Sequence, residues 1–161
     1  IVFGFPSFRR QVATLFRLNV SVGRLVIIAI GIPAIDLFLH YVLIGPIAYE
    51  LFPKPPFIYP KPTPGFLHGF DLTVGLVLVA VSEETIFRVV LPKFIERFTA
   101  SRFWIVLISS FLFSTIHWTN GVGAGLETFL IGIFFMLSIY WSGSVAPAML
   151  AHYLTNLFYF W

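Results

Sequence analysis

The chain has 161 residues, of which 58% are hydrophobic and 11% charged, with a formal net charge of +3. Soluble domains carry about 25% charged residues, and the mean hydropathy here is +0.94. The composition therefore excludes an ordinary water-soluble domain and predicts an all-α, polytopic transmembrane helix bundle of about five spans. The basic residues form no stripe, so no nucleic-acid partner is predicted. Without cysteines, disulfides and a cysteine nucleophile are excluded.

Residues 1–51 are predicted to hold an amphipathic segment and the first span. Residues 5–20 mix arginines with large apolar side chains, which is typical of an interfacial segment. An apolar run from about 22 to 49 then forms a span. Residues 52–65 hold six of the eleven prolines, and this composition favours an extended connector outside the membrane. The connector is the predicted boundary between two domains.

Residues 66–161 are predicted to form a core of four transmembrane helices. The glycines of 120–125 and the tripeptide Ser142-Gly143-Ser144 indicate turns. Pro147 suits the first turn of the last helix. The four predicted helices cover residues 66–98 with a kink at Pro92, 103–118, 126–141, and 147 onward.

The distribution of basic residues predicts how the bundle is oriented. Arginines flank the first span, and basic residues recur in the 92–102 turn, whereas the proline-rich connector has only Lys54 and Lys61. The positive-inside rule then places the N-terminus and the 92–102 turn in the cytoplasm. We therefore expect an integral, multi-pass protein surrounded by membrane lipid.

Ionisable side chains lie within the predicted spans, where a charge is costly and usually functional. Glu84 and Arg88 are four residues apart, so they share a helix face and can form an ion pair. Glu83 is rotated by about 100° and lacks this partner. Two carboxyl groups in such different settings can take different acid–base roles. A buried structural salt bridge with a spare glutamate explains the same pair equally well.

Two histidines and an asparagine are predicted at a depth similar to that of Glu83. Counted from the turn between their helices, Glu83 lies about 22 Å and His117 about 21 Å along the helix axis. His152 lies about 13 Å beyond the preceding turn and Asn156 about 20 Å, and these two share a face. These positions are compatible with one common site.

This group of side chains has two chemical interpretations. A glutamate beside a histidine can take a proton from water, and a histidine with an amide can stabilise an oxyanion. The set would then hydrolyse an amide without a covalent intermediate and without a cofactor. Alternatively, Glu83, His117 and His152 would hold Zn²⁺ with water in the open position, although the chain lacks the H-E-x-x-H spacing of common zinc peptidases.

Three motifs together resemble those of the CPBP family (CAAX protease and bacteriocin-processing, also called Abi). The stretch Glu83-Glu84-Thr85-Ile86-Phe87-Arg88 resembles its EExxxR motif, Phe113-Ser114-Thr115-Ile116-His117 its FxxxH motif, and His152-Tyr153-Leu154-Thr155-Asn156 its HxxxN motif. Their order and spacing fit, and the resemblance covers about residues 66–161. It implies an intramembrane endopeptidase of the glutamate type.

The resemblance also implies roles for these residues. Glu83 would activate water with the help of His117, and His152 with Asn156 would form the oxyanion site. Glu84 and Arg88 would support the architecture. The family name suggests a membrane-associated substrate, such as a prenylated CAAX-type peptide. The rival hypothesis is a catalytically silent relative that serves as a scaffold for other subunits of a larger membrane complex, and the intact motifs argue against it.

Other polar residues in the apolar helices are predicted to be structural. Asp36 and His40, four residues apart, are interpreted as a polar pair near a helix interface in preference to a proton relay or a second catalytic pair. Glu127 is predicted at a helix N-terminus, where a carboxylate is favourable. Small side chains allow helices to pack closely, and this role is predicted for Ser109, Ser110 and Ser114.

Overall fold

The computed structural model describes residues 13–16, 20–52 and 63–161. Within these ranges all regular structure is helical, so the all-α prediction is confirmed. Most of the predicted interfacial segment and most of the proline-rich connector lie outside the described residues.

The first part of the chain forms one long helical rod. Its three segments are α2 (Val22–Phe38), the π-helical η2 (Leu39–Ile44) and α3 (Gly45–Leu51). The Ser21 side chain accepts a hydrogen bond from the Arg24 amide and so caps the first turn. Pro33 lies inside α2 without ending it. The rod matches the span predicted at 22–49.

A second rod carries the glutamate motif. Its segments are α4 (Phe66–Phe70), the π-helical η3 (Asp71–Gly75), α5 (Leu76–Glu84), the π-helical η4 (Thr85–Val90) and α6 (Leu91–Ile95). The prediction extended this helix to residue 98, but it ends at Ile95. Pro92 lies in the first turn of α6, where the missing amide hydrogen is tolerated.

The remaining helices begin and end at residues that differ from the predicted ones. They are α7 (Arg102–Thr115), the 3₁₀ turn η5 (Trp118–Asn120), α8 (Val122–Ser142) and α9 (Ala146–Phe160). His117 therefore lies in the turn after α7 and not within a helix. The predicted turn at 120–125 is shorter, because only Gly121 there has a positive φ, of 96°, and α8 begins at the next residue.

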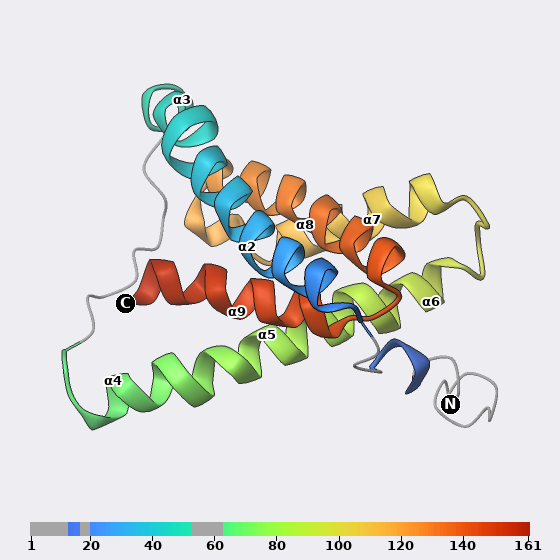
Figure 1. Ribbon diagram of the computed structural model, residues 1–161. Helices are drawn as coiled ribbons and strands as arrows, with labels where there is room; N and C mark the ends of the chain where they lie inside the picture. The colour runs from blue at the N-terminus through green and yellow to red at the C-terminus, as the bar shows by residue number, and fades with distance from the viewer. Residues whose placement is uncertain (1–12, 17–19, 53–62) are drawn as a thin grey trace.

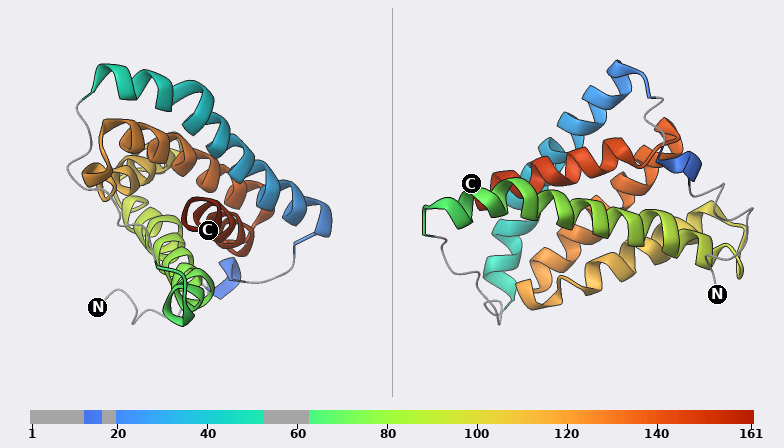
Figure 2. Two further views of the ribbon diagram at one scale, coloured as in Figure 1. Left: turned by 90° about the vertical axis from the view of Figure 1, so that its left-hand side faces the viewer. Right: turned by 90° about the horizontal axis from the view of Figure 1, so that it is seen from below.

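Helix α9 lies at the centre of the bundle. It runs between α2 and α5 (Figure 1) and is seen end-on among the other helices in the left panel of Figure 2. Ala148 and Ala151 are fully buried on α9, and they pack in one core with Ile32 of α2, Val89 of η4 and Phe135 of α8. This central position brings the HxxxN motif against the helix that carries the two glutamates.

Two helices of the described chain, Val22–Ala48 and Val122–Ser142, are long and apolar enough to cross a membrane. Helix α7 has 14 residues and α9 has 15. The rod from α4 to α6 is long enough, but it carries several charged side chains. The count of five spans therefore stays a prediction.

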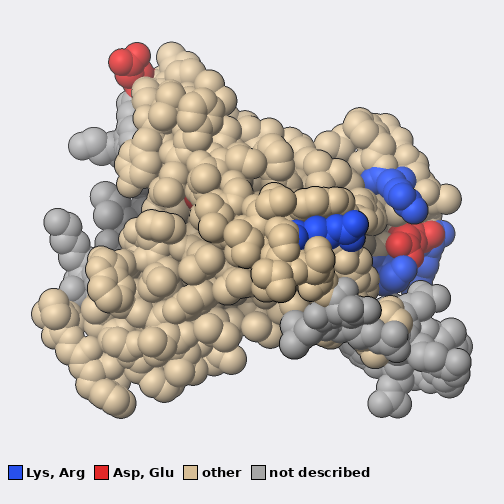
Figure 3. All heavy atoms as spheres, in the orientation of Figure 1, with Lys and Arg blue, Asp and Glu red and all other residues tan. Residues whose placement is uncertain are grey.

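Basic side chains of α2 and α7 lie at the same end of the molecule, each over an aromatic ring of α8. The guanidinium of Arg24 lies 5.7 Å from the ring centre of Trp141, and that of Arg102 lies 5.5 Å from the ring centre of Tyr140. In Figure 3, Lys and Arg gather toward this end, and the broad face beside it is almost without charge. The N-terminus of α2 and the start of α7 thus lie on one side, as the orientation prediction requires; that this side is cytoplasmic stays a prediction.

The close packing predicted for Ser110 is confirmed where α7 meets α8. A Cβ added to Gly132 would lie 3.0 Å from Ser110 Cβ and 3.2 Å from Ser110 Cα. We expect Gly132→Ala to lower the free energy of unfolding by about 1–3 kcal/mol through overpacking. Gly125→Ala, in the same helix with nothing within 4 Å, should instead be stabilised by up to about 1 kcal/mol. Equilibrium unfolding in detergent micelles measures both, and equal effects would contradict the close approach.

Candidate active site

The glutamate motif lies where α5 widens into a π-helical turn. Glu84 is the last residue of α5, and Arg88 lies in η4. Such π-turns are frequent at functional sites. Glu84 Oε2 lies 3.3 Å from Arg88 Nε, and both side chains are 0% exposed. The ion pair predicted from helical spacing is therefore confirmed.

His152 of α9 lies between the two glutamates. Its Nδ1 is 2.9 Å from Glu84 Oε1, and its Nε2 is 3.7 Å from Glu83 Oε2. The His152 side chain is buried, whereas that of Glu83 is 23% exposed. The contact between Glu84 and His152 was missed by the sequence analysis, which gave Glu84 only its arginine partner.

Two aromatic rings enclose this charged group. The Arg88 guanidinium lies 4.4 Å from the ring centre of Phe113 and 5.5 Å from that of Phe135. The imidazole of His152 stacks on Phe135 at 5.3 Å. Cations are attracted to ring faces, and more strongly when they are desolvated. Phe113 was noted only as part of a motif and Phe135 not at all, because an aromatic residue in an apolar helix looks like any other core residue.

A serine of α7 fixes the backbone of the widened turn. The hydroxyl of Ser109 donates a hydrogen bond to the carbonyl oxygen of Phe87 in η4. A π-turn disturbs the regular hydrogen-bond ladder of a helix, and Ser109 gives one of its carbonyls a partner. The serine thus does more than allow close packing: it helps to hold Arg88 beside Glu84.

His117 lies beside the same aromatic ring as His152. Its Nδ1 is 3.1 Å from the carbonyl oxygen of Phe113. The ring centre of Phe113 is 4.9 Å from that of His117 and 6.1 Å from that of His152. The carbonyl fixes Nδ1 as the donor in the neutral ring, which leaves Nε2 as the nitrogen that can meet a substrate.

Asn156 is the least engaged of the predicted site residues. It lies one turn after His152 on α9, so the two side chains share a face. Its side chain is half-buried and makes no hydrogen bond within the described part of the chain. The structure thus joins Glu83 and Glu84 to His152, with Arg88 paired to Glu84, whereas Asn156 is related to this group only by its position on α9.

The zinc ligand set is not assembled. Across residues 13–16, 20–52 and 63–161, no three His, Cys, Asp or Glu side chains are placed so that they could hold one metal ion. Glu83, His117 and His152 do not fit that role in this arrangement.

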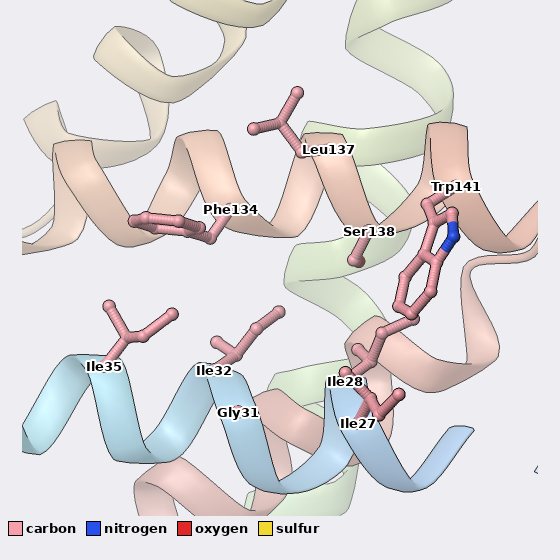
Figure 4. Close-up of a pocket in the computed structure, with 9 residues that line it drawn as sticks. All are labelled: Ile27, Ile28, Gly31, Ile32, Ile35, Phe134, Leu137, Ser138 and Trp141. Atoms are coloured by element: carbon pink, nitrogen blue, oxygen red, sulfur yellow. The ribbon is translucent and has the colours of Figure 1, made fainter. Parts of the chain in front are cut away.

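An apolar groove lies apart from these residues, between α2 and α8. It has a volume of about 250 Å³, and its walls include Ile35, Phe134 and Trp141. Figure 4 shows the side chains of the two helices on its opposite sides. Its polar side-chain groups are the indole N–H of Trp141 and the hydroxyl of Ser138, which donates to the carbonyl of Phe135. The groove has no group for acid–base chemistry.

Comparison with known proteins agrees with the motifs. The family model described as "Type II CAAX prenyl endopeptidase Rce1-like" matches residues 66–158, which is more than half of the chain and includes every residue of the candidate site. No curated protein and no solved structure matches the chain. The protein therefore belongs to the Rce1-like family of type II CAAX prenyl endopeptidases, a membrane-embedded family.

Proposed function

We propose that this protein is an intramembrane endopeptidase that hydrolyses a peptide bond of a membrane-associated, prenylated CAAX-type substrate with water activated by Glu83. One observation carries the proposal. Glu83 Oε2 is buried without a hydrogen-bond partner among the described residues, and it lies 3.7 Å from Nε2 of His152. A buried carboxylate oxygen without a partner beside an imidazole is a suitable base for a water molecule.

Glu84 and Arg88 would prepare His152 for this reaction. The Glu84 carboxylate accepts a hydrogen bond from Nδ1–H of His152, so Nε2 is the nitrogen that faces Glu83. The hydrogen bond made by one ring nitrogen sets the role of the other. Arg88 compensates the charge of Glu84, which would otherwise be an unpaired charge in the protein interior.

The reaction follows from these positions. Glu83 takes a proton from water while the water oxygen attacks the peptide carbonyl carbon. The carbonyl oxygen becomes an oxyanion, for which the amide of Asn156 and, when their rings are protonated, the Nε2–H groups of His152 and His117 are the available donors. Glu83 then returns the proton to the leaving nitrogen as the C–N bond breaks, which yields a carboxylic acid and an amine. The sequence analysis assigned the assistance of Glu83 to His117, whereas the geometry favours His152.

The proposal is tested with the purified protein in liposomes and a farnesylated peptide that ends in a CAAX sequence. We expect a shortened prenylated product in the mass spectrum, and slower cleavage of the same peptide without its prenyl group. A wild-type protein that cleaves neither peptide would contradict the proposal and favour the scaffold role.

His117→Ala should lower kcat by about 10²–10³-fold, the usual effect of removing one oxyanion donor. Because His117 lies half-buried in a turn, its loss should leave folding intact, which circular dichroism of the same sample checks. His68→Ala is the matched control, since His68 lies in α4 and is not part of the candidate site. Equal turnover in the two variants would remove His117 from the mechanism.

A further inference from the structure

A second polar group joins the N-terminal rod to α8 and α9, apart from the glutamate motif. The hydroxyl of Tyr159 lies 2.9 Å from Asp36 Oδ2 and 3.0 Å from Glu127 Oε1. His40 Nδ1 lies 3.0 Å from Glu127 Oε2. The sequence analysis paired Asp36 with His40 and placed Glu127 at a helix start. In the structure both acids instead contact the Tyr159 hydroxyl. Glu127 lies inside α8, which begins at Val122.

This group has too few hydrogens for both contacts of the Tyr159 oxygen if both acids are ionised. A tyrosine hydroxyl has one hydrogen to donate, and an ionised carboxylate can only accept. Both contacts of the Tyr159 oxygen are at normal hydrogen-bond distance. If the hydroxyl hydrogen points to one acid, the hydrogen of the other contact must come from the second acid. Two ionised carboxylates on one hydroxyl in an apolar bundle would also repel each other.

The surroundings decide which acid keeps the hydrogen. Glu127 has a second partner in His40, whose side chain is 30% exposed, so Glu127 can remain ionised with two donors. Asp36 is 5% exposed, and Tyr159 is its one hydrogen-bond partner among the described residues. The charged and titratable groups around Asp36 are Glu127, His40 and His152, together with the Tyr159 hydroxyl. Asp36 is therefore the acid that is most costly to ionise.

We propose that Asp36 is a proton-binding site, a neutral carboxylic acid that donates to the Tyr159 oxygen while Tyr159 donates to Glu127. The bound proton links α2, which carries Asp36, to α9 and α8. Its loss would leave two carboxylates on one hydroxyl and would weaken the contact of α2 with the other two helices. Tyr159 lies two turns after His152 on α9. Binding or loss of the Asp36 proton would therefore act on the helix that carries the candidate catalytic histidine. The proposal does not depend on the reaction at Glu83.

Infrared spectroscopy of the full chain in lipid tests the protonation directly. A protonated carboxyl group has a C=O stretching band that an ionised carboxylate lacks. We expect this band in the wild type at pH 5, its loss in Asp36→Asn, and its retention in Glu127→Gln. The asparagine amide can still donate to the Tyr159 oxygen, so the fold should be kept. A wild-type spectrum without a band that Asp36→Asn removes would overturn the proposal, and so would loss of the band in Glu127→Gln alone.

The pH dependence of unfolding gives a second test. If native Asp36 holds a proton that the unfolded chain releases, the native state binds more protons, and stability falls as pH rises. Between the aspartate pKa of the unfolded chain, about 4, and the higher pH at which native Asp36 releases its proton, the unfolding equilibrium constant of the wild type, relative to that of Asp36→Asn, should rise by about tenfold per pH unit. A ratio that does not change with pH would contradict the proposal. Neither test uses peptidase activity, so a failure here is distinct from a failure of the proposed function.

Discussion

Replacing Glu83 by glutamine is expected to lower kcat for peptide cleavage by about 10²–10⁴-fold, the usual contribution of a general base. Glutamine has nearly the shape of glutamate but cannot accept the proton of a water molecule. Because Glu83 is 23% exposed and makes no ion pair with Arg88, its loss should change folding little. The measurement is the initial rate of cleavage of a prenylated peptide at saturating concentration, in liposomes.

Glu96→Gln is the matched control for this variant. Glu96 is an exposed glutamate at the end of the same rod, and its Oε2 lies 2.8 Å from Lys93 Nζ. Surface ion pairs contribute little, so this variant should cleave at the wild-type rate. Wild-type turnover in Glu83→Gln, with folding confirmed, would show that another group activates the water.

Replacing Arg88 by methionine is expected to lower the free energy of unfolding by about 3–5 kcal/mol, as is typical when one partner of a buried ion pair is removed. Methionine can fill much of the arginine volume between the Phe113 and Phe135 rings, so the main loss is electrostatic. The Glu84 carboxylate would stay fully buried without its arginine. Equilibrium unfolding in detergent micelles, followed by tryptophan fluorescence, measures the difference.

Two further variants separate charge from packing. Arg97→Met removes an exposed arginine whose guanidinium lies 5.9 Å from the ring centre of Phe94, and should change stability by less than about 1 kcal/mol. The double variant Arg88→Met with Glu84→Gln removes both charges, and should recover part of the loss. If Arg88→Met is as stable as Arg97→Met, the buried ion pair does not hold this part of the fold together.

Helical periodicity predicted side-chain contacts correctly where both residues belong to one helix. The spacing of Glu84 and Arg88 fixes their common face, so the ion pair could be predicted and is present. Apolar runs likewise located the helices. They failed at the end of α7, because the apolar run continues to Trp118 whereas the backbone leaves the α-helix after Thr115. Hydropathy indicates where a chain is buried and says little about where a helix ends.

Contacts between helices could be predicted only in part. Counting residues gives the depth of a side chain along a helix axis, but it does not give the rotation of that helix or the choice of its neighbours. For this reason the approach of His152 to Glu83 was compatible with the sequence, whereas its contact with Glu84 was missed. The link from Asp36 to Tyr159 spans 123 residues, and one signal for it was available. Tyr159 lies two turns after His152 and so shares the polar face of α9.

The central claim is that Glu83 and Nε2 of His152 act together on the same water and substrate. A double-mutant cycle on kcat/KM tests it, with Glu83→Gln, His152→Asn and both together. Asparagine can still donate to Glu84 from the place of Nδ1, while it lacks the atom that faces Glu83. Residues that act as a unit are strongly non-additive, so we predict that the double variant is about as slow as the slower single variant. Losses that multiply, as for two independent groups, would contradict the account.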